Sequence, residues 1–220
     1  MFSFVLVFNL RPLLMDFNEK QIQILKVAEK LFAEIGFDGT SVRHIAKEAD
    51  VNVAMISYYF GSKEKLLEAL LLYRVADFKM ELETVMVQNL PHVEKLDALV
   101  SLMVNRIHRN RRTHKIINYE YTNTCRQIDF DAYVEQKKDS LGIIEAFVKD
   151  GQNKGVFKTD VHTKLLGATV IGTYFQVYNN KPFYKKLLGL DSDEAFENYM
   201  LTSLTQHIQQ TIKSLLLNEK

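Results

Sequence analysis

Residues 40–67 contain the side chains whose types and spacing most clearly indicate a chemistry, which is contact with a nucleic acid. Apolar residues recur at the i, i+3, i+4 and i+7 positions of one short helix, at Val42, Ile45, Ala46 and Ala49. A second short helix turns Ile56, Tyr59 and Phe60 inward, and five residues remain for its outer side: Val53, Ala54, Met55, Ser57 and Tyr58. Two short helices joined by a turn of about four residues predict a helix-turn-helix, whose second helix enters the major groove of DNA.

Local signals place the ends of these helices. Asn52 suits the N-cap of the second helix, and Gly61 suits its end. Ser62 is a candidate cap for a third helix, and Glu64 in its first turn suits the positive end of the helix dipole. The sequence therefore predicts a three-helix unit with a long third helix.

The stretch resembles the DNA-binding signature of TetR-family transcriptional regulators. The matching segments are 40–46 (TSVRHIA), 49–51 (ADV), 58–60 (YYF) and 62–67 (SKEKLL), and upstream Ile24, Ala28, Leu31, Phe32, Gly36 and Phe37 fit the first helix of the family. Two positions depart from the pattern. Asp50 stands where the turn usually has Gly, which indicates a slightly different turn, and Ser57 stands where a Tyr is frequent, which removes a phosphate contact.

The resemblance implies which residues contact DNA. Thr40, Ser41 and Arg43 would meet phosphates or a base edge. The front of the recognition helix would be formed by Asn52, Val53, Ala54, Met55 and Ser57, of which the apolar ones suit thymine methyl groups. Tyr58 and Tyr59 would donate to phosphates, and Lys63 would bind a phosphate beside a helix N-terminus.

The predicted fold is all-α, with about nine helices. A helix-turn-helix DNA-binding domain is expected over residues 16–76 and a larger ligand-sensing and dimerisation domain over 77–220. Outside the helix-turn-helix, helices are expected at about 18–35, 62–88, 93–110, 116–124, 129–151, 163–178 and 192–217. Residues 1–15 are interpreted as a gene-model extension ahead of a start at Met15, with a disordered or packed apolar arm as the alternative.

The segment 163–178 is apolar on more than one side, so it needs burial on two sides. One side suits the core and the other suits a dimer, which predicts a homodimer formed through the last two helices. A pocket for a small apolar or amphipathic ligand is expected among seven aromatic residues, although such a set at helical spacing is more often plain core: Tyr119, Tyr121, Phe130, Phe147, Tyr174, Phe175 and Tyr178.

The most basic segment, 105–115 (NRIHRNRRTHK), has two interpretations. It is either a patch for DNA phosphates or an anionic ligand, or the solvated end of one helix where cations complement the C-terminal dipole. We favour the second interpretation, because in the TetR-like architecture this part of the chain does not touch DNA.

Composition bounds the other possibilities. A formal net charge of +1 gives no general attraction to nucleic acid, and acidic residues slightly outnumber basic ones over residues 16–81, so DNA contact depends on a few placed side chains. The single cysteine, Cys125, fits a reducing cytoplasm and is interpreted as inert rather than as a redox sensor. His108 and His114 do not share a helical face, and neither a metal site, a cofactor, a catalytic motif nor a membrane span is expected.

The sequence thus predicts a cytoplasmic dimeric regulator, by family default a repressor, that binds a palindromic operator in double-stranded DNA and is released by a small ligand. Two alternatives stay open at this point. One is a dimeric DNA-binding protein whose larger domain senses no ligand. The other is an interaction module that has lost DNA binding, which Ser57 and the acidic balance of the first domain motivate.

Overall fold

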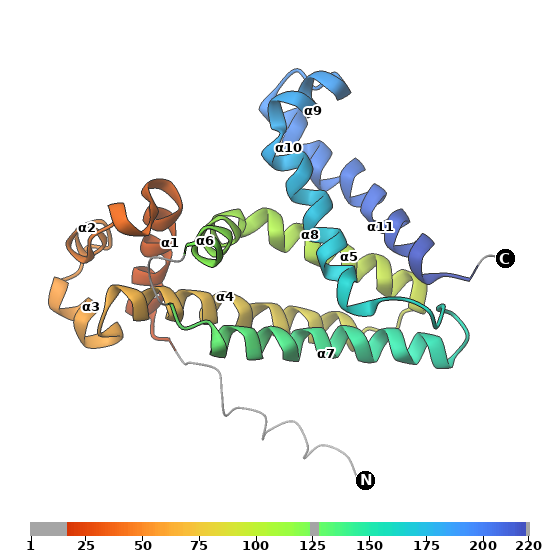
Figure 1. The fold of residues 1–220 in the computed structure, drawn as a ribbon, viewed down its shortest axis with the longest axis horizontal. Coiled ribbons are helices and arrows are strands. Elements are labelled where there is room, and N and C mark those ends of the chain that lie inside the picture. The colour runs from red at the N-terminus through yellow and green to blue at the C-terminus, as the bar shows by residue number, and fades with distance from the viewer. Residues whose placement is uncertain (1–16, 124–127, 219–220) are drawn as a thin grey trace, which may run out of the picture. The chain divides into compact units, whose positions relative to one another are not determined.

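A computed structural model describes residues 17–123 and 128–218 of the chain (Figure 1). These residues form helices, and the only β pairing among them is an isolated antiparallel bridge between Phe157 and Leu217. The expected all-α class is confirmed. The arm at residues 1–15 and the thiol of Cys125 lie outside the described residues, so their interpretations are not addressed.

The helices divide between two compact units. Unit 1 comprises Met1–Ala76 with Lys115–Tyr133, and unit 2 comprises Asp77–His114 with Val134–Lys220. Residues 115–133 pack with unit 1, although they follow residue 76 in the chain. The expected division into one domain at 16–76 and another at 77–220 therefore stays a prediction. The elements in chain order are α1 (Glu19–Gly39), α2 (Val42–Glu48), α3 (Val53–Phe60), α4 (Lys63–Met86), α5 (His92–Arg109), α6 (Arg111–Thr122), α7 (Asp131–Asn153), α8 (Thr163–Asn179), α9 (Lys181–Leu188), α10 (Asp193–Leu201) and α11 (Ser203–Leu216).

Unit 1 is built around a core shared by α1 to α4. Helix α1 begins at a capping box, in which the Asn18 side chain accepts from the Gln21 backbone and the Gln21 side chain accepts from the Asn18 backbone. Gly36 has a φ of +78°, so the regular helix is interrupted at the residue where its end was expected. The core residues of this unit include Ile24, Leu25, Ala28, Phe32, Ile45, Ile56, Phe60, Leu66 and Leu70.

A buried ion pair crosses this core. The Glu29 side chain is largely buried and accepts a hydrogen bond from the guanidinium of Arg74, which lies on α4. Removing one member of such a pair leaves a desolvated charge, so the pair fixes how α4 lies against α1.

Unit 2 has its own core between α5, α7, α8, α10 and α11. Large side chains from all five helices are buried there, including Leu99, Val104, Phe147, Val170, Tyr174, Phe196, Met200, Ile208 and Ile212. None of the described helices is long and apolar enough to span a bilayer.

The described helices differ from the predicted ones in three local details, of which the first two each add a helix to the expected number. The expected helix at 192–217 is two helices, since Thr202 between α10 and α11 has ψ −85°. Helix α9 was missed, although Pro182 in its first turn and Gly189 in the left-handed conformation after it are ordinary boundary signals. Helix α6 begins at Arg111 rather than near residue 116, because only Asn110 separates it from α5.

Candidate nucleic-acid interface

Helices α2 and α3 form a capped helix-turn-helix beside the first turns of α4 (Figure 1). The Ser41 hydroxyl accepts from the His44 backbone at 3.1 Å, and the Asn52 side-chain oxygen accepts from the Ala54 backbone at 2.8 Å. The Ser62 hydroxyl accepts from the Lys65 backbone at 3.1 Å. The caps expected at Asn52 and Ser62 are therefore confirmed, and Gly61, with φ +78°, ends α3 as expected.

The turn between the two helices is stabilised by long-range as well as local contacts. The Val51 backbone donates to the Ala46 carbonyl at 3.0 Å, and the Gln23 amide on α1 donates to the Ala49 carbonyl at 2.7 Å. Asp50 adopts φ +48°, so the left-handed conformation that glycine usually provides is retained here without a glycine. The sequence predicted a slightly different turn at Asp50, yet its backbone is in the left-handed conformation for which glycine is the usual residue.

Burial divides α3 into an inner and an outer side. Ile56 and Phe60 are buried and Tyr59 is half-buried, which fits the expected inward face. Val53, Ala54, Ser57 and Tyr58 are exposed and Met55 is half-buried, with the Tyr58 side chain 83% exposed. A short helix that leaves aromatic and aliphatic side chains in water on a side rigidly presented by its caps is suited to lie in a groove.

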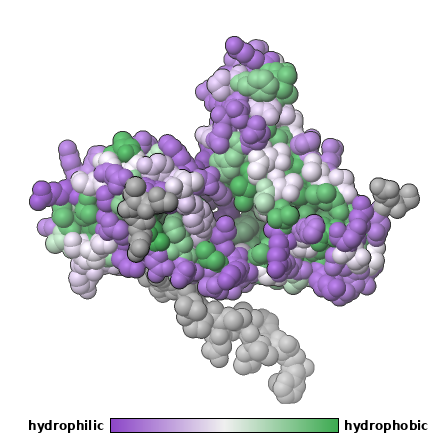
Figure 2. Space-filling view, viewed as in Figure 1, coloured by the Kyte–Doolittle hydropathy of each residue, from purple (hydrophilic) through white to green (hydrophobic). Residues whose placement is uncertain are grey.

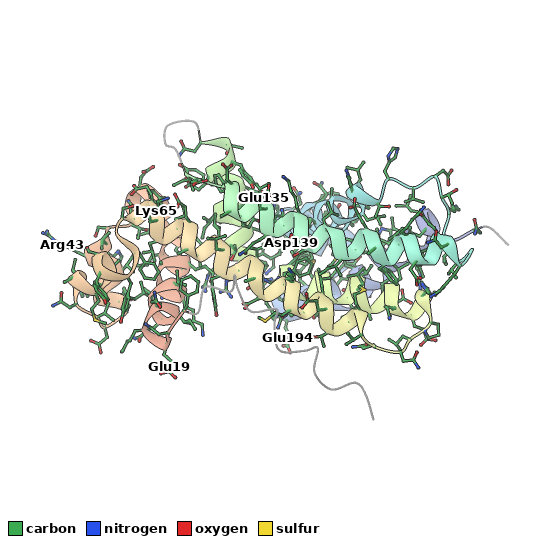
Figure 3. All side chains as sticks on the ribbon, turned by 90° about the horizontal axis from the view of Figure 1, so that it is seen from below. Glu19, Arg43, Lys65, Glu135, Asp139 and Glu194 are labelled. Carbon is green, nitrogen blue, oxygen red and sulfur yellow. The ribbon has the colours of Figure 1, made fainter. Side chains whose placement is uncertain are left out.

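The first helix of the motif presents a cation beside this side. Arg43 on α2 is exposed, and its side chain points away from the helices in Figure 3. Ser41 and Asn52 are also exposed, although the side-chain oxygen of each accepts a backbone hydrogen bond at a helix start. Their remaining hydrogen-bonding capacity can reach a phosphate.

Thr40 has a different place from the one expected for a DNA contact. It is 1% exposed, and its hydroxyl donates to the Gly36 carbonyl at 2.7 Å. This bond satisfies a carbonyl at the end of α1, so in this structure Thr40 stabilises the connection into α2 and does not present its side chain to a phosphate.

Lys63, predicted as a phosphate contact, has a structural role that the sequence did not reveal. Its ammonium donates to the carbonyl oxygens of Phe37 and Thr40, both at 2.9 Å, and lies 4.2 Å from the centroid of the Phe37 ring. These bonds connect the start of α4 to the end of α1. An ammonium has three donors, so the two carbonyls leave one for a phosphate. A lysine that caps a helix more than twenty residues earlier has no signal in a local pattern, which is why sequence reasoning missed it.

The seven aromatic residues predicted for a ligand pocket fall into separate groups. Tyr119, Tyr121 and Phe130 belong to unit 1, where the Tyr121 and Phe130 ring centroids are 4.5 Å apart. The four in unit 2 form a triad and a single residue: Tyr174 contacts Phe175 and Tyr178 at 5.2 and 6.0 Å, while Phe147 lies 5.6 Å from Phe157.

Half-buried polar groups accompany the triad in unit 2. The Tyr174 hydroxyl lies 3.0 Å from His108 Nδ1, and Glu197 accepts from Arg111 at 2.6 Å and lies 3.3 Å from His108 Nε2. Burial raises the pKa of Tyr174 to about 12, and burial with the nearby Arg111 charge lowers the pKa of His108. Phenol and imidazole are therefore neutral near pH 7, and the cluster is a polar network within an aromatic interior.

The basic segment 105–115 is largely committed to intramolecular contacts. Arg106 and Arg109 bind Glu81, at 3.2 and 2.9 Å. These cations lie in the last turn of α5, where they complement the helix dipole as the favoured interpretation requires. Among the described residues, no group of three or more His, Cys, Asp or Glu side chains is placed to hold a metal ion.

Comparison with known proteins supports the same assignment of the N-terminal motif. The description "Bacterial regulatory proteins, tetR family" matches residues 24–70, and "Tetracyclin repressor-like, C-terminal domain" matches residues 89–179. The protein named "Probable HTH-type transcriptional regulator YttP" of Bacillus subtilis is 33% identical over 141 residues, which are 62% of this chain and 67% of YttP. The chain belongs to the TetR family. It is a DNA-binding transcriptional regulator, as the helix-turn-helix geometry indicates.

Two further likenesses extend over more of this TetR-family chain. The HTH-type transcriptional repressor NicS of Pseudomonas putida is 28% identical over 181 residues, covering 76% of this chain and 80% of NicS. A transcriptional regulator from Saccharomonospora viridis, solved in complex with choline, superposes with a TM-score of 0.71 at 22% identity, covering 91% of this chain and 99% of that one. The fold of both units is therefore that of a TetR-family regulator.

Proposed function

We propose that this protein is a homodimeric repressor that binds a palindromic operator through α3 and leaves it when unit 2 binds a small molecule. The observation that carries the proposal is the exposed outer side of α3, with Val53, Ala54, Ser57 and Tyr58 presented by a doubly capped helix-turn-helix. Solvated apolar groups there are costly to leave in water, and a DNA groove would cover them.

The side chains divide into sequence reading and positioning. Val53, Ala54 and Met55 carry no charge and would contact thymine methyl groups in the major groove. Arg43 and the Tyr58 hydroxyl would donate to phosphates, which fixes the register of α3 without reading sequence. Because the charge balance of the first domain gives no bulk attraction, the specific complex depends on these few contacts.

Dimerisation would supply the second half of the operator. Two copies related by a two-fold axis place their recognition helices in successive major grooves, about 34–36 Å apart. We assign the interface to α8 together with α10 and α11. This assignment is supported by α8, which buries Val170 and Tyr174 on one side and leaves Leu165 58% exposed on another.

Ligand control would act through unit 2. The triad of Tyr174, Phe175 and Tyr178 with the His108 and Glu197 polar groups suits an amphipathic molecule, since rings bury an apolar part and the polar groups fix orientation. A ligand that prefers a conformation with a different half-site spacing lowers DNA affinity by linkage. Repression by NicS and the choline complex of the S. viridis regulator are consistent with this scheme.

We infer that the protein acts in the cytoplasm. The test begins with operator selection from random DNA duplexes by the purified full chain. We expect an inverted repeat, bound at a stoichiometry of two chains, and an affinity that falls steeply with salt. A metabolite screen by thermal shift then separates a sensor from a ligand-independent regulator. If the intact protein selects no sequence, the proposal of a palindromic operator read by α3 fails.

A further inference from the structure

Helix α9 turns its apolar side into solvent. Phe183 and Leu187, one turn apart, are 61% and 63% exposed, and no residue of α9 is buried. A surface helix of a globular protein ordinarily does the opposite and packs its apolar stripe against the core. Hydrophobic surface accordingly gathers at the end of unit 2 where Figure 1 draws α9 (Figure 2).

The polar edge of α9 holds the helix in this orientation. Lys181 and Lys185, also one turn apart, both bind the carboxylate of Asp193 at the start of α10, at 3.0 and 2.9 Å. Hydrogen bonding to these lysines, Lys185 first, holds the pKa of Asp193 below its usual range. Tyr184 packs against the unit 2 core from the same side of the helix. The exposed pair is thus presented by a fixed helix.

Both helix boundaries reinforce that presentation. Pro182 in the first turn fixes the backbone for helix entry, and the backbone N–H of Gly189, a residue in the left-handed conformation, donates to the Lys185 and Lys186 carbonyls at the helix end. A helix with a proline start and a glycine stop keeps Phe183 and Leu187 in a defined geometry. Two large apolar side chains held side by side in water on an ordered helix are typical of a surface that contacts a partner.

Charges around the exposed pair are self-complementary. Lys186 lies exposed between Phe183 and Leu187 in sequence, and the exposed carboxylates of Asp191 and Glu194 follow a few residues later. A two-fold axis through such a surface pairs the cation of one copy with a carboxylate of the other, twice. An anionic membrane would meet the same lysine but would repel the two carboxylates.

We propose that the outer side of α9 belongs to the homodimer interface, where Phe183 and Leu187 anchor it on a second copy of this chain. The inference rests on the homodimer of the proposed function and extends it. Eight residues cannot supply the roughly 800 Å² per partner of a standard interface, so α9 adds to the contact assigned to α8, α10 and α11. Phe183 acts as the aromatic anchor typical of such surfaces.

The test is the dimer dissociation constant of the full chain, measured by sedimentation velocity over a concentration series. Phe183→Ser with Leu187→Ser is expected to raise it about 10- to 100-fold. Val87→Ser is the matched control, because Val87 is 82% exposed elsewhere on unit 2 and should leave dimerisation unchanged. The double variant and the control variant each remove only exposed side chains. The melting temperature of either variant, measured at high dilution where the protein is monomeric, should therefore equal that of the wild type.

A charge exchange tests the same surface without removing the anchors. Lys186→Glu should weaken the dimer about 10-fold, and adding Glu194→Lys should restore most of that loss. An unchanged dissociation constant for both the serine pair and Lys186→Glu, with a dimeric wild type, overturns the inference and leaves the proposed homodimer standing. A monomeric wild type overturns both. Flotation of the wild type with anionic phosphatidylglycerol vesicles, lost in the serine pair while dimerisation persists, assigns α9 to a membrane instead.

Discussion

The ammonium of Lys63 lies 2.9 Å from the carbonyl oxygen of Phe37 and 4.2 Å from the centroid of the Phe37 ring. One cation therefore ends α1, begins α4 and lies beside the surface assigned to DNA. The side chain that connects these two helices of unit 1 is thus also the one that we propose as a phosphate contact.

Replacing Lys63 by alanine should consequently have two effects. Loss of charged hydrogen bonds to the Phe37 and Thr40 carbonyls should lower the free energy of unfolding by about 1–3 kcal/mol in a denaturant titration. It should also weaken binding to all duplexes about equally and reduce the salt dependence. Lys65→Ala is the control, because the exposed ammonium of Lys65 forms a surface ion pair with the neighbouring Glu68, whose loss should leave stability unchanged. A loss confined to one operator base would contradict the phosphate role.

Asp50→Gly should stabilise the turn of the helix-turn-helix. Asp50 holds φ +48°, a conformation that costs a side-chain-bearing residue roughly 1 kcal/mol and costs glycine little. We expect a rise of about that size in the free energy of unfolding, with DNA affinity retained. Gly61→Ala is the converse test, since Gly61 has φ +78° and should lose a similar amount. Destabilisation by Asp50→Gly would show that the carboxylate contributes more than its backbone strain costs.

Two glycines of α7 should respond oppositely to alanine. A Cβ at Gly151 would lie 2.2 Å from Cδ2 of Phe157, whereas one at Gly142 meets nothing within 4 Å. Gly151→Ala should lower the free energy of unfolding by about 1–3 kcal/mol through overpacking, and Gly142→Ala should raise it by about 0.5–1 kcal/mol through helix propensity. Thermal denaturation of the two variants checks the pair. Equal melting temperatures would contradict the close packing of Gly151 on Phe157.

His114 should make the fold less stable in mild acid. Burial, and then the charges of Lys137 and Arg106, lower its pKa to about 4 in the folded protein, from 6.5. Between these values the unfolded chain binds the extra proton, so stability falls as pH drops from about 6.5 to 4 and is unaffected above 7. The change attributable to His114 is roughly 3 kcal/mol. Urea titrations at neutral and acidic pH should show a weaker pH dependence in His114→Gln. Identical dependence in both proteins would assign the effect to other groups.

The parts of the fold that local sequence determines were predicted well. Asn52, Ser62 and Gly61 act within their own helical turns, so their capping roles followed from residue type and position. The same argument could have found α9 from Pro182 and Gly189. In contrast, the apolar seam of α10 continues into α11 with nearly the same period, so the break at Thr202 does not show in the pattern.

The site was predictable in outline and less so in the role of each residue. The outer side of α3 followed from periodicity, because a two-sided helix assigns its exposed residues by elimination. Thr40 and Lys63 did not follow, since their hydrogen bonds depend on where the end of α1 lies relative to α4. That relationship is a property of tertiary packing, which a motif of neighbouring residues does not encode.

The most direct test of the account is the affinity of Ala54→Glu for the selected operator, measured by fluorescence anisotropy. Ala54 is exposed on the outer side of α3, so the carboxylate leaves folding intact while it meets the base edges and phosphates. Val87→Glu is the control for an added charge on exposed surface. The account predicts at least about a 100-fold loss for Ala54→Glu and none for Val87→Glu. Wild-type affinity in Ala54→Glu would contradict the assignment of α3 as the helix that reads DNA.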